Sequence, residues 1–348
     1  MALRDLWDYV RASGDRRFRQ QGYVTSGMGI LERYRKASGY WAPHLENNRR
    51  GLLKIAEKLG PERGGTLLVL GAGRLLDVPW EQLFPRFERV VLYDADFCIV
   101  HYVERIVAAS RAANMPKPLF DIGDVTASVV DTAAWAEHNI SIATSATQAA
   151  AELARGFDSA GTPQAPWARA YSDVRLVVST NLLSQLGYYP RRHIQHVFRE
   201  RFQQPFEKFD HSAKSLEKYF DRVRARHIYD LCSQKKAWTY LSGDVDVVTY
   251  QIAGRETHNL LAQAPPRDAG VRLDERGELC FDWKVQIVER SDPLNGQKIR
   301  DLWPQSPKGP APTREKWVWH IVPQGSEQKY RETGRVHIVE GWTRAPGG

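Results

Sequence analysis

The sequence has few cysteines, and this excludes two common kinds of structural framework. Only Cys98, Cys232 and Cys280 occur among 348 residues, and no two of them form a C-x-x-C pair. An odd number of widely spaced cysteines gives neither a complete disulfide framework nor a thiolate zinc site. We therefore expect three reduced, mostly buried thiols.

Long apolar runs are also absent. No stretch reaches the roughly 18 apolar residues that a transmembrane helix requires, so neither a membrane span nor a membrane partner is expected. The first twenty residues contain Asp5 and Asp8 and lack the apolar centre of a secretory signal. These features predict a cytoplasmic protein.

Several catalytic motifs are missing. There is no P-loop, no H-E-x-x-H metal motif and no G-x-S-x-G nucleophile elbow. A nicotinamide-binding G-x-G-x-x-G turn after Leu70 would need glycine at position 76, which is Leu76. The sequence therefore disfavours nucleoside triphosphatases, zinc proteases, serine hydrolases and nicotinamide dehydrogenases, and it predicts no metal site.

Positive charge exceeds negative charge. The formal net charge is +8, which favours anionic partners such as nucleic acid, nucleotides or acidic small molecules. Basic residues cluster along the chain, and Arg191-Arg192 stand out because they follow Tyr188-Tyr189. The alternative is that these clusters are solvated helix faces.

Short apolar runs alternate with helical patterns through most of the chain, which predicts a parallel sheet covered by helices on both faces. The expected strands are 66–70, 90–93, 119–122, 174–179 and 238–241. The expected helices are 80–83, 97–113, 125–138, 143–155, 191–204 and 216–231. This order is typical of an α/β fold.

The two ends of the chain differ from this pattern. Residues 1–60 have helical spacing, including Leu3, Trp7 and Val10, and Gly60-Pro61 should end the last helix. Residues 281–289 and 316–322 are strand-like, a proline-rich loop lies between them, and 336–339 is expected as an edge strand. We predict a helical N-terminal extension, 1–60, that covers the site of a single α/β domain, 61–345.

Polar residues follow the first three expected strands. Gly71-Ala72-Gly73 follow the first strand, Asp94 and Asp96 the second, and Gly123-Asp124 the third. Glycines there allow a sharp turn close to a ligand, and an acidic residue after the second strand can accept ribose hydroxyls. Each carboxylate has a second interpretation, because aspartate also caps helices.

The segments LLVLGAGR, VVLYDAD, FDIGDV and LVVSTNLLSQL resemble, in order and spacing, the class I S-adenosylmethionine-dependent methyltransferases. The resemblance covers roughly residues 64–188. It implies a seven-stranded, mostly parallel Rossmann-like sheet with an antiparallel end. It also implies S-adenosylmethionine as cofactor and S-adenosylhomocysteine as product. The implied cofactor-binding residues are Leu70, Gly71, Ala72, Gly73, Asp94, Ala95, Asp124, Val125, Thr180 and Asn181.

The sequence departs from the family pattern at several positions. Val69 replaces the usual acidic residue, Leu75 replaces a third glycine, and Asp77 is a substitute acid nearby. Asn181 is followed by Leu182-Leu183 rather than by the prolines of amino-methylating nucleic-acid enzymes. A non-catalytic relative that kept the fold would show the same departures.

Methyl transfer requires alignment of a nucleophile and, for some acceptors, removal of a proton. Asn181 should lie nearest the methyl group, while Tyr188 and His193 can orient or deprotonate an acceptor; a packing role is the alternative for each. We predict methyl transfer to an oxygen or nitrogen nucleophile of an unidentified small or macromolecular acceptor. The alternatives are a non-catalytic binding protein and a basic, nucleic-acid-associated factor.

Overall fold

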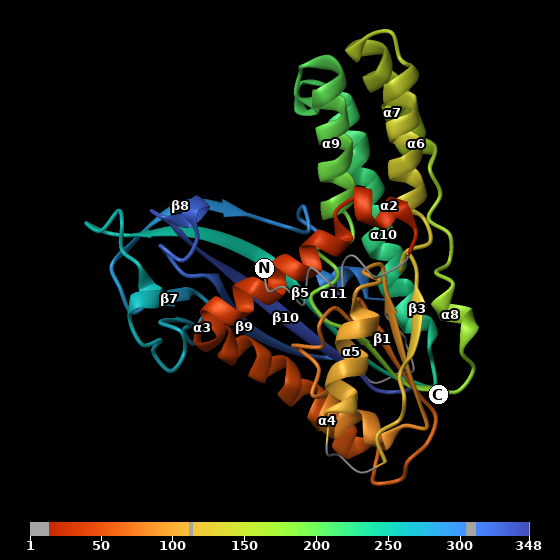
Figure 1. Cartoon of the computed structure of the whole chain (residues 1–348), viewed down its shortest axis with the longest axis vertical. Helices are drawn as coiled ribbons and strands as arrows, with labels where there is room; N and C mark the ends of the chain where they lie inside the picture. Colours follow the sequence, from red (N-terminus) through yellow and green to blue (C-terminus); the bar gives the residue numbers. More distant parts are fainter. Residues whose placement is uncertain (1–13, 111–113, 304–310, 348) are drawn as a thin grey trace.

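The computed structural model describes residues 14–110, 114–303 and 311–347. An eight-stranded sheet forms its centre, in the order β3-β2-β1-β4-β5-β10-β9, with β8 paired to β5 (Figure 1). The strands are β1 (Thr66–Leu70), β2 (Arg89–Asp94), β3 (Leu119–Ile122), β4 (Val174–Ser179), β5 (Trp238–Ile252), β8 (Val285–Ser291), β9 (Thr313–Val322) and β10 (Gly334–Arg344). A two-stranded sheet pairs β6 (Val271–Leu273) with β7 (Leu279–Phe281).

The helices are α2 (Arg16–Gln20), α3 (Tyr23–Lys58), α4 (Trp80–Leu83), α5 (Ile99–Ala108), α6 (Val129–Ile142), α7 (Ala146–Ser159), α8 (Trp167–Ala170), α9 (Tyr188–Phe202), α10 (Asp210–Ser233) and α11 (Ile299–Leu302). Strands β1 to β5 are parallel neighbours, whereas β10 runs antiparallel to both β5 and β9. This is the mostly parallel, Rossmann-like sheet with an antiparallel end that the sequence predicts.

The antiparallel end differs from the prediction in three ways. The sheet has eight strands rather than seven, because β8 pairs with β5 in addition to the seven strands of the main order, while the start of the expected strand 281–289 belongs to β7 in the second sheet. Strand β5 continues to Ile252, well beyond the expected end at Leu241. Residues 336–339 belong to β10, which lies between β5 and β9 and is not an edge strand. Arg335 and His337 interrupt the apolar pattern of β10, so the sequence of this strand does not indicate that it lies inside the sheet.

Several helix boundaries also move. Helix α6 begins at Val129 instead of residue 125, because a turn held by Asp124 and Thr126 comes first. Helix α7 begins at Ala146, where the Ser145 hydroxyl caps the Gln148 backbone N–H. Helix α5 is shorter than predicted, and α9 and α10 begin earlier. The predicted helical positions Leu3, Trp7 and Val10 lie outside the described residues, as does most of the predicted proline-rich loop.

Alternate residues of the parallel strands face two different helical layers. Leu68 and Leu70 of β1 pack in the cluster formed by α6 to α10, whereas Leu67 and Val69 pack against α3, α4 and α5. All four side chains are fully buried. Burial on both faces explains why these strands read as continuous apolar runs rather than as alternating ones.

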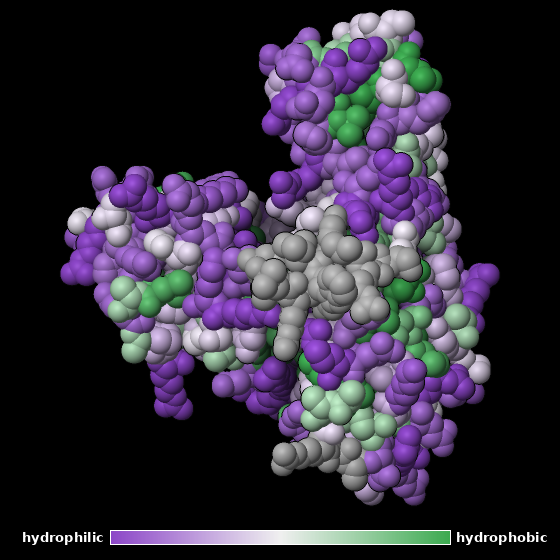
Figure 2. Space-filling model, in the orientation of Figure 1, coloured by the Kyte–Doolittle hydropathy of each residue, from purple (hydrophilic) through white to green (hydrophobic). Residues whose placement is uncertain are grey.

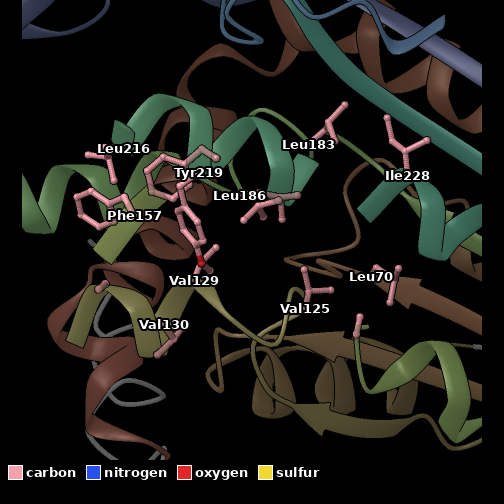
Figure 3. Packing of buried hydrophobic residues seen from close by; sticks show 14 of the residues in the cluster. Leu70, Val125, Val129, Val130, Phe157, Leu183, Leu186, Leu216, Tyr219 and Ile228 are labelled. Carbon is pink, nitrogen blue, oxygen red and sulfur yellow. The ribbon is translucent and has the colours of Figure 1, made fainter. Parts of the chain in front are cut away.

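Helices α6, α7, α9 and α10 extend beyond the sheet as an arm (Figure 1). At its base, Phe157, Leu216 and Tyr219 pack together, while Val125 and Leu186 lie nearer the sheet (Figure 3). The face of the molecule in Figure 2 is mostly hydrophilic, with small hydrophobic areas on the arm. Within the described ranges, no helix is long and apolar enough to span a membrane.

Helix α3 joins the antiparallel end of the sheet to the parallel end. Its middle packs on β5, β9 and β10 through Tyr40, Trp41 and Leu45, and its last turns pack through Leu52 and Ile55 in the cluster beside β1. The helix ends at Lys58, just before Gly60 takes a positive φ of 79°. The predicted end of this helix is therefore confirmed.

His320 of β9 lies in the antiparallel half of the sheet and is buried as a neutral side chain. Its Nδ1 donates to the Ala269 carbonyl (2.9 Å), and its Nε2 accepts from the Tyr250 hydroxyl (2.7 Å). Burial lowers the pKa of His320 from 6.5 to about 4, and it lowers the pKa of His227 in α10 to a similar value. Both histidines are therefore harder to protonate in the folded protein than in the unfolded chain.

We predict that the protein loses stability as the pH falls from about 6.5 to about 4. In this window the imidazoles of His320 and His227 bind a proton more readily in the unfolded chain than in the folded protein. Each of them therefore lowers the free energy of unfolding by about 3 kcal/mol at the acid end of the window. Urea unfolding of the wild type and of His320→Gln across this range should give a shallower pH dependence for the variant. The exposed-site control His101→Gln should follow the wild type, and equal slopes in all three proteins would refute the assignment.

Candidate functional site

A cavity of about 760 Å³ lies at the carboxyl ends of the parallel strands. Its walls come from the loops after β1, β2, β3 and β4, from α2 and α3, and from β9 and β10. In open α/β sheets this edge is where ligands bind, because the strands end there and their loops can diverge. Val125 and Leu186 connect the cavity to the core beneath the arm (Figure 3).

Nearly all the predicted site residues line this one cavity. They are Gly71, Ala72, Gly73, Asp94, Ala95, Asp124, Val125, Thr180, Asn181, Tyr188 and His193. Leu70 is the exception, because its side chain is fully buried in the core within β1. The structure therefore brings together residues from four separate loops and from α9.

The turn after β1 is held against the end of β2. Gly71 and Gly73 have positive φ values of 63° and 50°, and the Gly71 backbone N–H donates to the Tyr93 carbonyl at 2.8 Å. A methyl group on Gly71 would lie only 2.9 Å from the Leu182 side chain. Glycine is therefore required here both by the backbone conformation and by the close approach of the β4 loop.

Asp94 joins two backbone turns at the centre of the site. One carboxylate oxygen accepts from the Gly73 backbone N–H (2.7 Å), and the other accepts from the Asp96 backbone N–H (2.7 Å). Burial raises the pKa of this carboxyl, although these hydrogen bonds oppose the shift. Each oxygen retains a further lone pair for a ligand hydroxyl.

Asp96 forms a buried ion pair with Arg74 of the β1 turn, with 3.2 Å between the charged atoms. Its other oxygen accepts from the Cys98 backbone N–H at the start of α5. Burial raises the pKa of Asp96 to about 6, although the Arg74 guanidinium opposes this shift. Asp96 therefore holds the turn that leads into α5 and pairs with Arg74, and it also lines the cavity.

Asp124 organises the turn before α6. Its carboxylate accepts from the Thr126 backbone N–H and hydroxyl and from the Val130 backbone N–H. Burial raises the pKa of this carboxyl as well. The residue thus has the capping role that was its second interpretation, and it still forms part of the cavity wall.

Asn181 follows β4 in an uncommon backbone conformation. Its φ is 52°, and its backbone N–H donates to the Ser242 carbonyl at 2.9 Å. Its side-chain nitrogen lies 3.1 Å from Nε2 of His44, while its side-chain oxygen is buried without a partner among the described residues. The side-chain oxygen is therefore a buried acceptor that no described residue satisfies.

His44 of α3 connects the loops after β1 and β4. It is fully buried and stacks on Trp319 at 4.1 Å between ring centroids. Because the Trp317 indole can only donate, its bond to Nδ1 (3.0 Å) leaves the ring proton on Nε2, which lies 3.0 Å from the Asp77 carboxylate. His44 was expected only as part of a covering helix, and the structure gives it a positioning role.

Tyr188 and His193 of α9 enter the cavity from the arm. Tyr188 is 46% exposed, and the Arg192 guanidinium lies 5.5 Å from its ring centroid. His193 Nε2 lies 2.8 Å from the Glu137 carboxylate of α6, so this histidine also ties two helices of the arm together. His193 therefore helps to hold α6 and α9 together, whether or not it also contacts a methyl acceptor.

Sequence reasoning missed Asp244 of β5 and His337 of β10, which both line the cavity. Nδ1 of His337 lies 3.1 Å from an Asp244 oxygen that also accepts from the Ser184 hydroxyl at 2.9 Å. Burial raises the pKa of Asp244, but His337, Ser184 and His44 together hold it below its ordinary value. The position of Asp244 shortly after the expected strand 238–241 is the signal in the sequence that could have pointed to it.

The basic clusters are dispersed over different elements and largely bonded within the chain. Arg191 pairs with Glu217, Arg224 with Asp221 and Arg226 with Asp230. Arg33 pairs with Glu327, and Arg222 donates to backbone carbonyls of α7 and the residue that follows it. These contacts indicate that these basic residues stabilise the fold and do not form one shared surface for an anionic partner.

No family model and no curated protein matches the sequence. Among solved structures, the chain is similar to the DhpI–SAH complex, with 13% identity, 93% of this chain and 98% of that chain covered, and a TM-score of 0.27. It is also similar to the glycopeptide N-methyltransferase MtfA complexed with S-adenosylmethionine, with 12% identity, 87% and 94% covered, and a TM-score of 0.28. With scores this low, the strand order rather than these likenesses establishes the fold.

The positive φ of Asn181 leads to a test with two matched variants. We predict that Asn181→Ala is less stable than Asn181→Gly by about 1 kcal/mol, because alanine is strained in the left-handed region and glycine is not. Both variants lose the amide, so the difference isolates the backbone. Urea unfolding measures it, and an Asn181→Ala protein as stable as Asn181→Gly would contradict the assigned conformation.

Proposed function

We propose that the cavity at the ends of β1 to β4 binds S-adenosylmethionine and that the protein transfers its methyl group to an oxygen or nitrogen nucleophile. The observation that carries this proposal is the meeting of the Gly71–Gly73 turn, Asp94 and the β4 loop at one cavity. The cofactor supplies an activated methyl group, so the chain must bind, orient and exclude water.

The residues present fit such a cofactor. The turn at Gly71–Gly73 lets a ligand approach the backbone closely, and Asp94 retains acceptor capacity for the two hydroxyls of a ribose. In this proposal Asp124 and Val125, which line the cavity, would face the adenine, and Thr180 and Asn181 would face the transferred methyl group. The carboxylates of Asp77 and Asp244 complement the positive charge of the cofactor's sulfonium and amino groups.

We further propose that residues 1–60 cover the site of a methyltransferase-like domain formed by residues 61–345. Gln20 to Arg33 contribute much of one cavity wall, and the Ser26 hydroxyl contacts the Tyr189 hydroxyl across it. Gln21 donates to the Val130 carbonyl of α6 at 3.0 Å. These contacts join the segment that includes α2 and the start of α3 to the arm, and they support the proposed covering role.

We predict that S-adenosylmethionine and S-adenosylhomocysteine bind the purified protein, whereas NAD does not. Asp94→Asn should weaken both affinities about 10- to 100-fold, because it removes a charge-assisted acceptor and presents an amide N–H to the backbone donor of Gly73 or Asp96. Asp246→Asn is the matched control, since Asp246 pairs with Arg290 outside the cavity. Isothermal titration calorimetry measures all of these affinities.

The outcomes separate the parts of the proposal. If neither S-adenosyl compound binds the wild type, the proposed function fails. If they bind but Asp94→Asn has the affinity of Asp246→Asn, the cofactor site is correct in kind and the assignment of Asp94 is wrong. A screen with tritium-labelled S-adenosylmethionine, using matched alcohol, phenol, amine and carboxylate compounds, then identifies the class of acceptor.

A further inference from the structure

Asp244 and His337 face each other because of an irregularity in the sheet. Where β5 pairs with β10, Ile338 is opposite Asp246 but Val339 is opposite Asp244, so Val245 has no partner and forms a β-bulge. Bulges redirect side chains and are common beside active sites. In a regular ladder Val245 would be opposite Val339, and Asp244 would point to the other face. The bulge therefore places Asp244 on the same face as His337.

Three buried atoms of this pair make no hydrogen bond among the described residues. Asp244 is 1% exposed, and its Oδ1 is one of them. Nδ1 and Nε2 of His337 are the others: Nδ1 has the Asp244 carboxylate beside it as an ion-pair contact, whereas the Trp319 ring lies edge-on to the imidazole, with 5.6 Å between centroids. Buried polar atoms normally have partners, so an unpaired Nε2 in a cavity wall is suited to receive a ligand.

The carboxylate determines which nitrogen of His337 remains free. An ionised Asp244 favours a proton on Nδ1, the nearer nitrogen at 3.1 Å, and this leaves the lone pair of a neutral imidazole on Nε2. The Ser184 hydroxyl holds the same carboxylate oxygen and fixes it relative to the β4 loop. A carboxylate that orients an imidazole in this way produces a general base.

We propose that His337, positioned by Asp244, is the general base of this site and that the methyl acceptor is a hydroxyl compound, an alcohol or a phenol. This inference rests on the proposed methyl transfer. The hydroxyl oxygen forms a bond to the methyl carbon, the carbon–sulfur bond breaks with its electron pair remaining on sulfur, and the hydroxyl proton moves to Nε2 of His337. The products are a methyl ether, S-adenosylhomocysteine and an imidazolium beside Asp244.

The chemistry of the base selects the acceptor class. A neutral hydroxyl is a weak nucleophile until it loses its proton, so a base beside it accelerates the reaction. A neutral amine already has a free lone pair, and a carboxylate has no proton to lose. The Asp244–His337 pair therefore fits an alcohol or phenol better than an amine or an acid.

The first test measures the protonation of His337 without any turnover. Long-range proton–nitrogen NMR of protein labelled with nitrogen-15 histidine, at mildly alkaline pH, should show His337 with its proton on Nδ1. His337→Gln assigns the signal. In Asp244→Asn the proton should shift towards Nε2, whereas the control Asp246→Asn should match the wild type. A wild-type proton on Nε2, or no difference between the two aspartate variants, would overturn the proposal.

The second test uses the acceptor found by the tritium screen. His337→Gln should lose about 10²- to 10⁴-fold in methyl transfer to a hydroxyl acceptor and should bind S-adenosylhomocysteine as the wild type does. Preferred methylation of amines or carboxylates, or full activity in His337→Gln, would overturn the inference while leaving the proposed function intact. Failure of the wild type to bind the cofactor would instead refute the proposed function.

Discussion

The long strand β5 determines how the two halves of the molecule meet. Its first residues pair in parallel with β4 and its later residues pair antiparallel with β8, while β10 pairs antiparallel with it along nearly its whole length. No other strand contacts both kinds of neighbour in this way within the described part of the chain. The bulge at Val245 lies between the part of β5 that pairs with β4 and the part that pairs with β8. The strand that joins the two halves therefore also places Asp244 in the cavity wall.

Four buried or part-buried carboxylates line the cavity, and each is stabilised by a different set of contacts. Asp94 relies on backbone N–H groups from two turns, whereas Asp96 relies on the buried guanidinium of Arg74. Asp124 is held by the turn that precedes α6, and Asp244 by an imidazole and a hydroxyl. Burying a charge is costly unless it is paired or hydrogen-bonded, so these contacts are what allow several acids to occupy one site.

The sequence predicts the parallel half of the fold closely, because its strands are short, largely apolar runs followed by glycine or polar residues. The limits of β1, β3 and β4 are as expected, and the residues after them meet at one edge. The Asp244–His337 pair was not predictable, since its geometry depends on the pairing register of two distant strands and on a one-residue bulge. The role of His44 was hidden for a similar reason: its partners come from three separate elements.

The departures from the family pattern are accommodated by the backbone and by nearby side chains. Leu75, which stands where a third glycine is common, takes a φ of 55°, in the left-handed region that glycine favours. Its side chain is buried in the cluster beside β1, and this packing offsets a strain of about 1–2 kcal/mol. Val69 is part of the core, while the carboxylate of Asp77 reaches the cavity instead, held by His44 and Asn48. The altered turn therefore keeps a left-handed residue at the position of the third glycine, and a carboxylate from a neighbouring position lines the cavity.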